Sequence, residues 1–320
     1  MEGITVGVFG TDVQTKSLFE GAVAKKSEAE GVVVYTRVEG GRRCSFLDTS
    51  DYPERIQGYS RVASIADHAL YFYPSSGRVG APDGELAVLL GAFGLDGTLE
   101  LTGGSPDLDV ARAMLKGTPV AGYKPDIRDP RSSAIDLSHV SPRTDFPKEQ
   151  TLIYVDRAFT VKGVGTVALG FVLSGKVSIH DQLRPIPGPA DVRADVKGIQ
   201  VNDLDFDSAG RGIRVGLSLR GVEARDLEKS HWLDDGALQL SNSPSFELAK
   251  SPYYKQEVTS RDLHVQLPGE IVPARMAVSG KASVTAQLPW QVPVWEGMRA
   301  AVVDLNGGNL RIVGGLTSKF

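Results

Sequence analysis

The sequence has few of the features that place a protein in a membrane or outside the cell. Cys44 is the single cysteine among 320 residues, so no disulfide can form within the chain. No apolar run approaches the roughly 18 residues of a membrane-spanning helix, and Met1-Glu2-Gly3 carries no basic stretch typical of a secretory signal. The histidines are too dispersed to suggest a metal site: His68, His139, His180, His231 and His264. We therefore expect a cytoplasmic protein with no resident metal and no membrane contact.

A strong excess of basic charge is also missing. The net charge is −4, and it is unevenly divided, since residues 1–150 hold 16 basic against 21 acidic residues and residues 151–320 hold 19 against 18. This balance excludes a strongly basic DNA-binding protein, but it allows a local patch that contacts phosphates.

The first 123 residues alternate short β runs with helical patterns. Apolar strands are predicted at 4–10, 31–38, 44–48, 68–73 and 99–102, with a last short strand around Val120, and helices at 16–26, 53–66 and 85–93. Ser105-Pro106 is typical of the start of a further helix. Strands that alternate with helices predict an α/β domain with a mostly parallel sheet.

The pattern changes after Tyr123. Residues 124–150 contain four prolines and ten charged residues without periodicity, which is typical of a linker. From residue 151 onward, short alternating segments bounded by turn residues predict two small antiparallel β-barrels, 151–242 and 243–320, divided near Asn242–Pro244. The expected molecule is therefore multidomain, with an α/β domain (1–123), a linker (124–150) and two barrels.

The turn after the first strand approximates a phosphate-binding loop. The pattern G-x-x-x-x-G-K-[ST] cradles phosphates with backbone N–H groups, neutralises them with lysine and binds Mg²⁺ through the hydroxyl. Gly10, Lys16 and Ser17 are in register with it, but Thr15 replaces the second glycine. An alternative is a plain strand-to-helix turn capped by polar residues.

A second motif makes the first domain resemble that of translational GTPases. Phe46-Leu47-Asp48-Thr49-Ser50-Asp51-Tyr52 lies where such a protein has D-T-P-G-H, and Asp48 and Thr49 match. Asp51 replaces the glycine that meets the γ-phosphate, and Tyr52 replaces the histidine that positions water. The guanine-reading N-K-x-D is absent at 101–105, and only 32 residues separate Lys16 from Asp48. The resemblance therefore implies a degenerate, P-loop GTPase-like domain.

The second half carries a clearer resemblance. Residues 156–170 (DRAFTVKGVGTVALG) are similar to the opening of the second domain of elongation factors, most of all in the selenocysteine-specific branch. That domain receives the aminoacyl end of tRNA. The resemblance implies that Asp156, Arg157, Phe159 and Arg214 line or flank this pocket, whereas Ala168 lies near the position of an expected histidine. Two alternatives remain, with Phe159 in the core and Asp156–Arg157 as a local ion pair.

By the same resemblance, Gly10, Lys16, Ser17 and Asp48 form a vestigial nucleotide site, with Ser17 and Asp48 as metal ligands only if Mg²⁺ is bound. If tRNA binds, phosphate contacts are expected from the third domain, with Tyr253 and Tyr254 as stacking partners. The candidate cations are Lys250, Lys255, Arg261, Arg275, Lys281, Arg299, Arg311 and Lys319. The alternative is a solvated barrel surface.

These observations favour an elongation-factor-like translation protein without GTPase activity. We expect a monomer that has no catalytic residues, requires no cofactor and binds an aminoacyl-tRNA, with the ribosome or translation factors as further partners. One alternative is a divergent but active elongation factor that binds GTP and Mg²⁺ and delivers tRNA to the ribosome. Another is a scaffold whose former switch surface holds a protein partner, for which exposed apolar residues between Tyr71 and Leu90 would be the sign.

Overall fold

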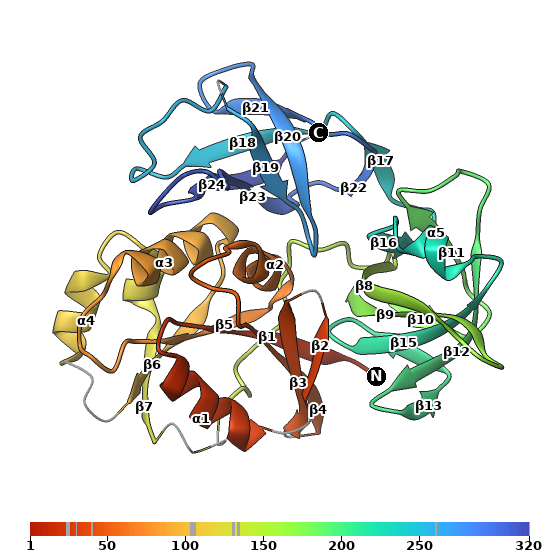
Figure 1. Cartoon of the computed structure of the whole chain (residues 1–320), viewed down its shortest axis with the longest axis horizontal. Coiled ribbons are helices and arrows are strands. Elements are labelled where there is room, and N and C mark those ends of the chain that lie inside the picture. The colour runs from red at the N-terminus through yellow and green to blue at the C-terminus, as the bar shows by residue number, and fades with distance from the viewer. Residues whose placement is uncertain are drawn as a thin grey trace.

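The computed structural model describes residues 1–23, 26–29, 31–39, 41–102, 107–129, 132, 135–259 and 261–319. Three bodies meet at a central junction: an α/β domain, a barrel beside its β2–β4 end and a second barrel above its helices α2 and α3 (Figure 1). We call them domains 1, 2 and 3. Among the helices that the structure describes, none is long and apolar enough to cross a bilayer.

Domain 1 is a seven-stranded sheet of order β2-β3-β4-β1-β5-β6-β7, parallel from β4 to β7 and antiparallel at β2–β3–β4. Every residue of β1 and β5 is buried, because helices cover both faces of the sheet. The strands are β1 (Gly3–Phe9), β2 (Lys26–Ala29), β3 (Val32–Glu39), β4 (Arg42–Thr49), β5 (His68–Phe72), β6 (Gly97–Thr102) and β7 (Lys124–Arg128). The helices are α1 (Val13–Val23), α2 (Gln57–Ile65), α3 (Ala81–Phe93), α4 (Leu108–Met114) and the 3₁₀ turn η1 (Pro119–Gly122).

The predicted alternation of strands and helices is confirmed, with local differences. The strand expected at Val120 is wrong, because Pro119 begins the 3₁₀ turn η1 there. The structure also adds β2, and Asp107 caps α4, while Ser105-Pro106 lies outside the described residues. Lys124–Arg128, in the segment expected as a linker, pairs in parallel with β6 as the sheet edge.

Domain 2 is an antiparallel sheet of order β11-β16-β8-β9-β15-β12-β13, and an additional pairing joins the first strand, β11, to the penultimate strand, β12. Alternating residues of β12 and β15 point into its core, as the period-2 pattern predicts. Its elements are β8 (Leu152–Val161), β9 (Gly165–Ser174), β10 (Lys176–Ser178), β11 (Gln182–Ile186), β12 (Ala194–Val201), β13 (Leu204–Phe206), β14 (Ser208–Gly210), β15 (Arg214–Arg220), α5 (Ala224–Leu227) and β16 (Trp232–Asp234).

Domain 3 is a closed barrel of order β18-β21-β20-β19-β23-β24. The fold class is therefore confirmed: an α/β domain is followed by two antiparallel β domains. The remaining strands are β17 (Gln239–Ser241), β18 (Ser245–Lys250), β19 (Leu263–Gln266), β20 (Ile271–Val278), β21 (Ser283–Gln287), β22 (Val292–Val294), β23 (Arg299–Val303) and β24 (Ile312–Ser318).

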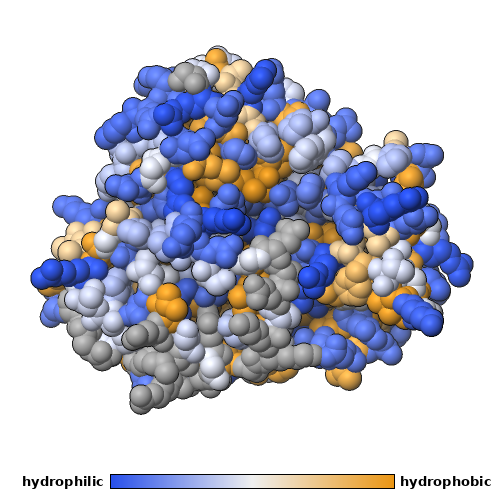
Figure 2. Space-filling view, viewed as in Figure 1, coloured by the Kyte–Doolittle hydropathy of each residue, from blue (hydrophilic) through white to orange (hydrophobic). Residues whose placement is uncertain are grey.

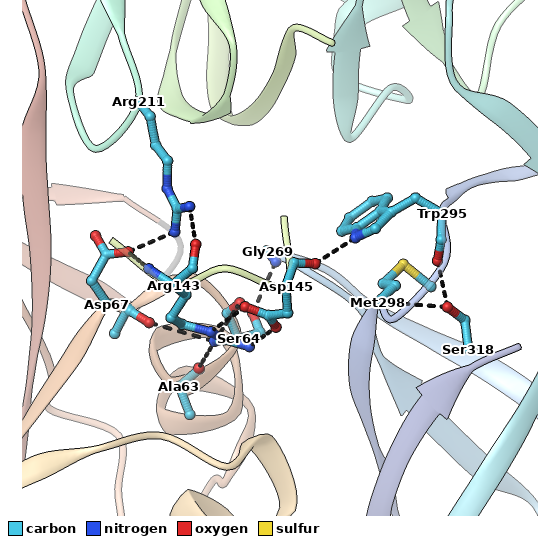
Figure 3. Close-up of polar contacts among 11 residues, drawn as sticks. Ala63, Ser64, Asp67, Arg143, Asp145, Arg211, Gly269, Trp295, Met298 and Ser318 are labelled. Carbon is cyan, nitrogen blue, oxygen red and sulfur yellow. Dashed lines mark hydrogen bonds and ion pairs between the residues drawn. The ribbon is translucent and has the colours of Figure 1, made fainter. Parts of the chain in front are cut away.

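The end of the segment expected as a linker fills the junction between the domains (Figure 3). The guanidinium of Arg211, from domain 2, donates to Asp67 Oδ1 at 2.6 Å and to the carbonyl of Arg143. The amide of Arg143 also donates to Asp67 Oδ1, at 2.9 Å, and the Trp295 indole of domain 3 donates to the Asp145 carbonyl at 2.6 Å. Residues 143–145 therefore tie the three domains together.

Candidate functional site: a closed phosphate loop and an interdomain pocket

The loop expected to wrap phosphates is largely helical. Strand β1 ends at Phe9, and α1 begins at Val13, three residues before Lys16, whose amide donates to Asp12 O at 3.0 Å. Gly10 has φ +150°, and a Cβ there would lie 2.9 Å from Phe72 O. The Lys16 amide, one of the backbone N–H groups that a phosphate loop aims at its ligand, therefore already has an acceptor within the helical turn.

The side chain of Lys16 is buried and fully engaged. Its ammonium lies 2.8 and 2.9 Å from the Asp48 oxygens and 2.6 Å from the hydroxyl of Tyr59. The relative exposure of the Lys16 and Asp48 side chains is 6% and 10%. The Tyr59 hydroxyl accepts from Lys16, and its single proton can go to Asp48 Oδ1 at 2.8 Å or Gly10 O at 3.1 Å. The structure thus brings together Gly10, Lys16 and Asp48 around Tyr59.

The other expected nucleotide contacts do not join this cluster. Ser17 lies on α1 with its side chain exposed, and residues 103–105 of the absent guanine reader lie outside the described residues. In the part of the chain that the structure describes, no group of three or more His, Cys, Asp or Glu residues could hold a metal ion. The carboxylate expected to serve Mg²⁺, Asp48, instead neutralises Lys16.

Tyr52 is part of the contact between domains 1 and 3. Its hydroxyl lies 2.6 Å from Pro82 O and 3.1 Å from Glu85 Oε2. Burial, followed by the negative charge of Glu85, raises the pKa of Tyr52 well above its usual value. Glu85 accepts from Nε and Nη2 of Arg311 in domain 3. Nη2 also donates to the carbonyl of Pro53, and Nη1 donates to the carbonyl of Glu54. Tyr52, which replaces the water-positioning histidine of translational GTPases, is therefore part of the interface between domains 1 and 3.

In domain 2 the structure pairs Asp156 with Arg214. The guanidinium donates from Nε to Asp156 Oδ2 at 2.9 Å and from Nη2 to Oδ1 at 3.1 Å. Its Nη1 donates to Ser27 Oγ of domain 1 at 3.0 Å. The alternative of an Asp156–Arg157 pair is wrong, since Arg157 is exposed on β8, and the core alternative for Phe159 is wrong, since that side chain is 36% exposed.

Arg214 also lines a pocket of about 250 Å³ between domains 1 and 2, which we call the interdomain pocket. Ser27 and Thr36 contribute from β2 and β3, and the hairpin turn Asn202–Asp203 closes the domain 2 side. Thr36 Oγ1 donates to Asn202 Oδ1 at 3.3 Å. The remaining lining residues are Leu169, Gln200, Val215 and Gly216.

The cations expected to contact tRNA have different surroundings. Arg311 packs against Glu85, so it is not available to contact a nucleic acid. Tyr254, expected as a stacking partner, lies in the core and is not available either. Arg261 is paired with Asp304, and Lys319 with Glu247. Arg275 is exposed beside a hollow of about 630 Å³ next to Trp290, and Figure 2 shows an apolar area over β19 and β20. The remaining candidates, Lys250, Lys255, Lys281 and Arg299, are side chains at the surface of domain 3.

The order of an α/β domain and two antiparallel β domains is that of the translational elongation factors, which fits the remnants of a phosphate loop. No protein-family model matches the chain. It is 28% identical to an uncharacterized protein of Methanocaldococcus jannaschii over 98% of this chain and 99% of that one. It is also 45% identical to the selenocysteine-specific elongation factor of that organism over 73 residues, which cover 23% of this chain and 15% of the relative.

The fold matches solved structures of the same class. A bacterial selenocysteine-specific elongation factor, EF-Sec, superposes with a TM-score of 0.84 at 16% identity, covering 99% of this chain and 58% of that one. The expected resemblance to translational GTPases, and within them to the selenocysteine-specific branch, is thereby confirmed.

Sequence reasoning missed Tyr59, Ser27, Thr36, and the pairing of Glu85 with Arg311. Tyr59 lies in the helix predicted at 53–66, and helical spacing identifies the buried side of a helix but not the partner of a hydroxyl. Glu85 and Arg311 are 226 positions apart, so no local pattern could connect them. The pair Asn202-Asp203, typical of a tight hairpin turn, was the one available signal for the pocket rim.

Proposed function

We propose that this chain is an elongation-factor-like protein that no longer hydrolyses GTP and that binds aminoacyl-tRNA. The observation that carries the first part is the buried contact of Lys16 with Asp48 and Tyr59. Nucleotide phosphates would need the Lys16 ammonium, and Mg²⁺ would need the Asp48 carboxylate. Separating the two would leave each charge buried without its partner, which is costly.

The tRNA part is supported by the 73 residues over which the chain is 45% identical to a selenocysteine-specific elongation factor. The interdomain pocket includes Arg214, one of the residues that the resemblance assigns to the aminoacyl end. We keep Arg157 and Phe159, both exposed on β8, as flanking candidates. The barrel limits 151–242 and 243–320 are part of the same proposal, whereas domain 1 includes the edge strand β7 beyond the expected limit of residue 123.

Titration calorimetry with GTP, GDP and ATP in the presence of Mg²⁺ tests the loss of nucleotide binding. We expect no binding at millimolar nucleotide for the unaltered chain. Micromolar binding that Lys16→Ala abolishes would support the alternative of a divergent, active elongation factor. Gly21→Ala, at an exposed position of the same helix where a Cβ would meet nothing within 4 Å, is the matched control for folding.

Filter binding of charged and uncharged tRNA over a range of salt concentrations tests the second part. We expect an affinity for charged tRNA that falls steeply with salt, since phosphate contacts release counterions. Absence of binding at low salt would contradict the proposal. The scaffold alternative gains no support from the surface between Tyr71 and Leu90, where no large hydrophobic side chain is exposed.

A further inference from the structure

A further cleft lies where the segment 139–145 passes between domains 1 and 3, and we call it the linker cleft. Its volume is about 700 Å³, which is within the size range of small-molecule sites. Its domain 1 wall is formed where β5, β6 and β7 begin. Since these strands run parallel to β1, the cleft is at the edge of the sheet opposite the former nucleotide loop, which follows β1.

Two cations from different domains line the linker cleft. Lys124 begins β7 in domain 1, and Arg299 begins β23 in domain 3. Both residues are exposed, and neither forms a hydrogen bond or an ion pair with the residues that the structure describes. Arginine and lysine are the side chains that proteins use to bind phosphate groups. A single anionic ligand here could therefore contact both domains.

The charges at the rim of the cleft already stabilise one carboxylate. Hydrogen bonds from Ser138, followed by the charges of His139 and Lys124, lower the pKa of Asp136, which is exposed. Nearby positive charge favours the anionic form of a group over its neutral form. The same field would favour an anionic ligand inside the cleft.

The other strong charges of the lining are satisfied by one another. Arg143 donates from Nε to Asp145 Oδ1 at 2.9 Å and from its amide to Asp67 Oδ1 at 2.9 Å. Asp67 Oδ1 also accepts from Arg211 at 2.6 Å (Figure 3). These residues form a fixed wall, so the two unpaired cations are the groups left for a ligand.

The lining also offers hydrogen-bonding groups of both kinds. Thr144 and Thr317 supply hydroxyls, and His139, whose ring lies edge-on to His68 with 5.5 Å between the centroids, supplies an imidazole. Asp96, exposed immediately before β6, supplies a carboxylate that can accept from a hydroxyl or an amine. A ligand that matches the cleft therefore carries donors as well as an anionic group.

The described lining residues suit a small molecule better than a nucleotide. Phe93 and Tyr123 are 0% and 5% exposed, so neither offers a ring face on which a nucleobase could stack. The polar groups described above can be satisfied by a ligand without a base.

We propose that the linker cleft binds a small phosphate monoester that carries hydroxyl or amino groups. The phosphate contacts Lys124 of domain 1 and Arg299 of domain 3, and a hydroxyl or amino group donates to Asp96. The cleft is separate from the former nucleotide loop and from the interdomain pocket, so this inference does not depend on the proposed function.

The test is titration calorimetry on the full chain with two small monoesters, glycerol 3-phosphate and phosphoethanolamine. Inorganic phosphate lacks the alcohol and amino groups of the esters, and glycerol lacks the phosphate. We expect both esters to bind at least about threefold more tightly than inorganic phosphate, and we expect no binding of glycerol. Absence of ester binding at millimolar concentration would overturn the proposal, as would an affinity no better than that of inorganic phosphate.

Three variants place the ligand in the cleft. Lys124→Met and Arg299→Met each remove one cation and should weaken ester binding by at least about tenfold. Asp96→Asn should weaken binding of phosphoethanolamine more than binding of inorganic phosphate. Because Arg299 packs against Gly94, thermal unfolding of Arg299→Met is measured beside its affinity, and Lys124→Met, at an exposed sheet edge, gives the independent test.

Lys250→Met is the matched control. Lys250 is an exposed lysine that lines, together with Arg299, a neighbouring hollow of about 280 Å³, and it is not part of the linker cleft. Its substitution should leave the affinity for both esters unchanged. Weaker binding in Lys250→Met with unchanged binding in Lys124→Met would place the ligand in that hollow and overturn the proposal.

Discussion

At the scale of single residues, the buried ammonium of Lys16 shows how a nucleotide site can close. The side chain keeps the position and the chemistry that a phosphate loop requires, yet its ammonium donates hydrogen bonds to Asp48 and Tyr59. A buried ion pair of this kind need not add stability, but breaking it leaves an uncompensated charge. The folded state therefore keeps Lys16 and Asp48 paired with each other.

Lys16→Met should lower the free energy of unfolding by about 3–5 kcal/mol, because Asp48 would remain buried without a counter-charge. Lys16→Met combined with Asp48→Leu should recover most of the loss, since no buried charge remains. Urea denaturation of the two variants and the unaltered chain measures both effects. If the double variant is no more stable than Lys16→Met, the loss does not come from the unpaired charge of Asp48, and this explanation is contradicted.

His68 gives a prediction for the pH dependence of stability. Burial, followed by the neighbouring His139, lowers the pKa of His68 from 6.5 to about 4. As the pH falls below 6.5, His68 is protonated in the unfolded chain but stays neutral in the folded chain. The contribution of His68 to the free energy of unfolding is therefore fully present above pH 6.5 and declines toward pH 4. We expect His68 to account for about 1–3 kcal/mol of this decline.

His68→Gln should flatten the profile of unfolding free energy between pH 6.5 and pH 4 in urea titrations. His180→Asn is the control, because His180 is exposed and its φ of +78° suits asparagine. An equally steep profile in His68→Gln would mean that other groups cause the decline.

At the scale of elements, the stretch between Lys16 and Asp48 is mostly helix and strand. Most of its residues belong to α1, β2, β3 and β4, so the described part of this stretch contains no long loop that could reorder around a γ-phosphate. The β2–β3 hairpin extends the sheet toward domain 2 and supplies Ser27 and Thr36 to the interdomain pocket. Where a GTPase switch has a mobile loop, this chain has the strands β2 and β3, which line the interdomain pocket.

Helix α3 offers a matched pair of glycines. Gly94 ends the helix with φ +57°, and a Cβ there would lie 2.8 Å from Arg299 Nη1 of domain 3. Gly94→Ala should therefore destabilise the protein by about 1–2 kcal/mol. Gly84, inside the same helix, has nothing within 4 Å of a Cβ, so Gly84→Ala should stabilise by about 0.5–1 kcal/mol. Thermal unfolding of the two variants checks the opposite signs.

At the scale of the whole molecule, polar contacts hold each pair of domains. Arg311 joins domain 3 to domain 1, Arg211 joins domain 2 to domain 1, and the Trp232 indole of domain 2 donates to Pro268 O of domain 3 at 2.7 Å. Such an arrangement needs no nucleotide to hold it closed. Under the proposed function, the protein would bind and release its partner without a change of domain orientation driven by hydrolysis.

Arg311→Met should weaken the contact between domains 1 and 3. Glu85, whose side chain is 2% exposed, would lose its counter-charge, and we expect a loss of about 3–5 kcal/mol together with faster hydrogen exchange in α3 and β24. Lys319→Met removes an exposed ion pair with Glu247 on the same domain and should cost less than about 1 kcal/mol. Equal effects of the two substitutions would contradict a special role for Arg311.

The sequence by itself determined most of the alternation of strands and helices in domain 1, though not β2, β7 or the turn η1 at Val120. It also determined the change to β structure after residue 151 and the remnants of the nucleotide motifs. These follow from local periodicity, turn residues and short spacings, which act between neighbours in the chain. Only the tertiary structure decided that Lys16 is bound by Asp48 and Tyr59, that Asp156 pairs with Arg214 rather than Arg157, and that β2 and β3 form a wall of the interdomain pocket. Those contacts join residues distant in sequence, and burial, which makes their charges require each other, exists only once the domains have packed.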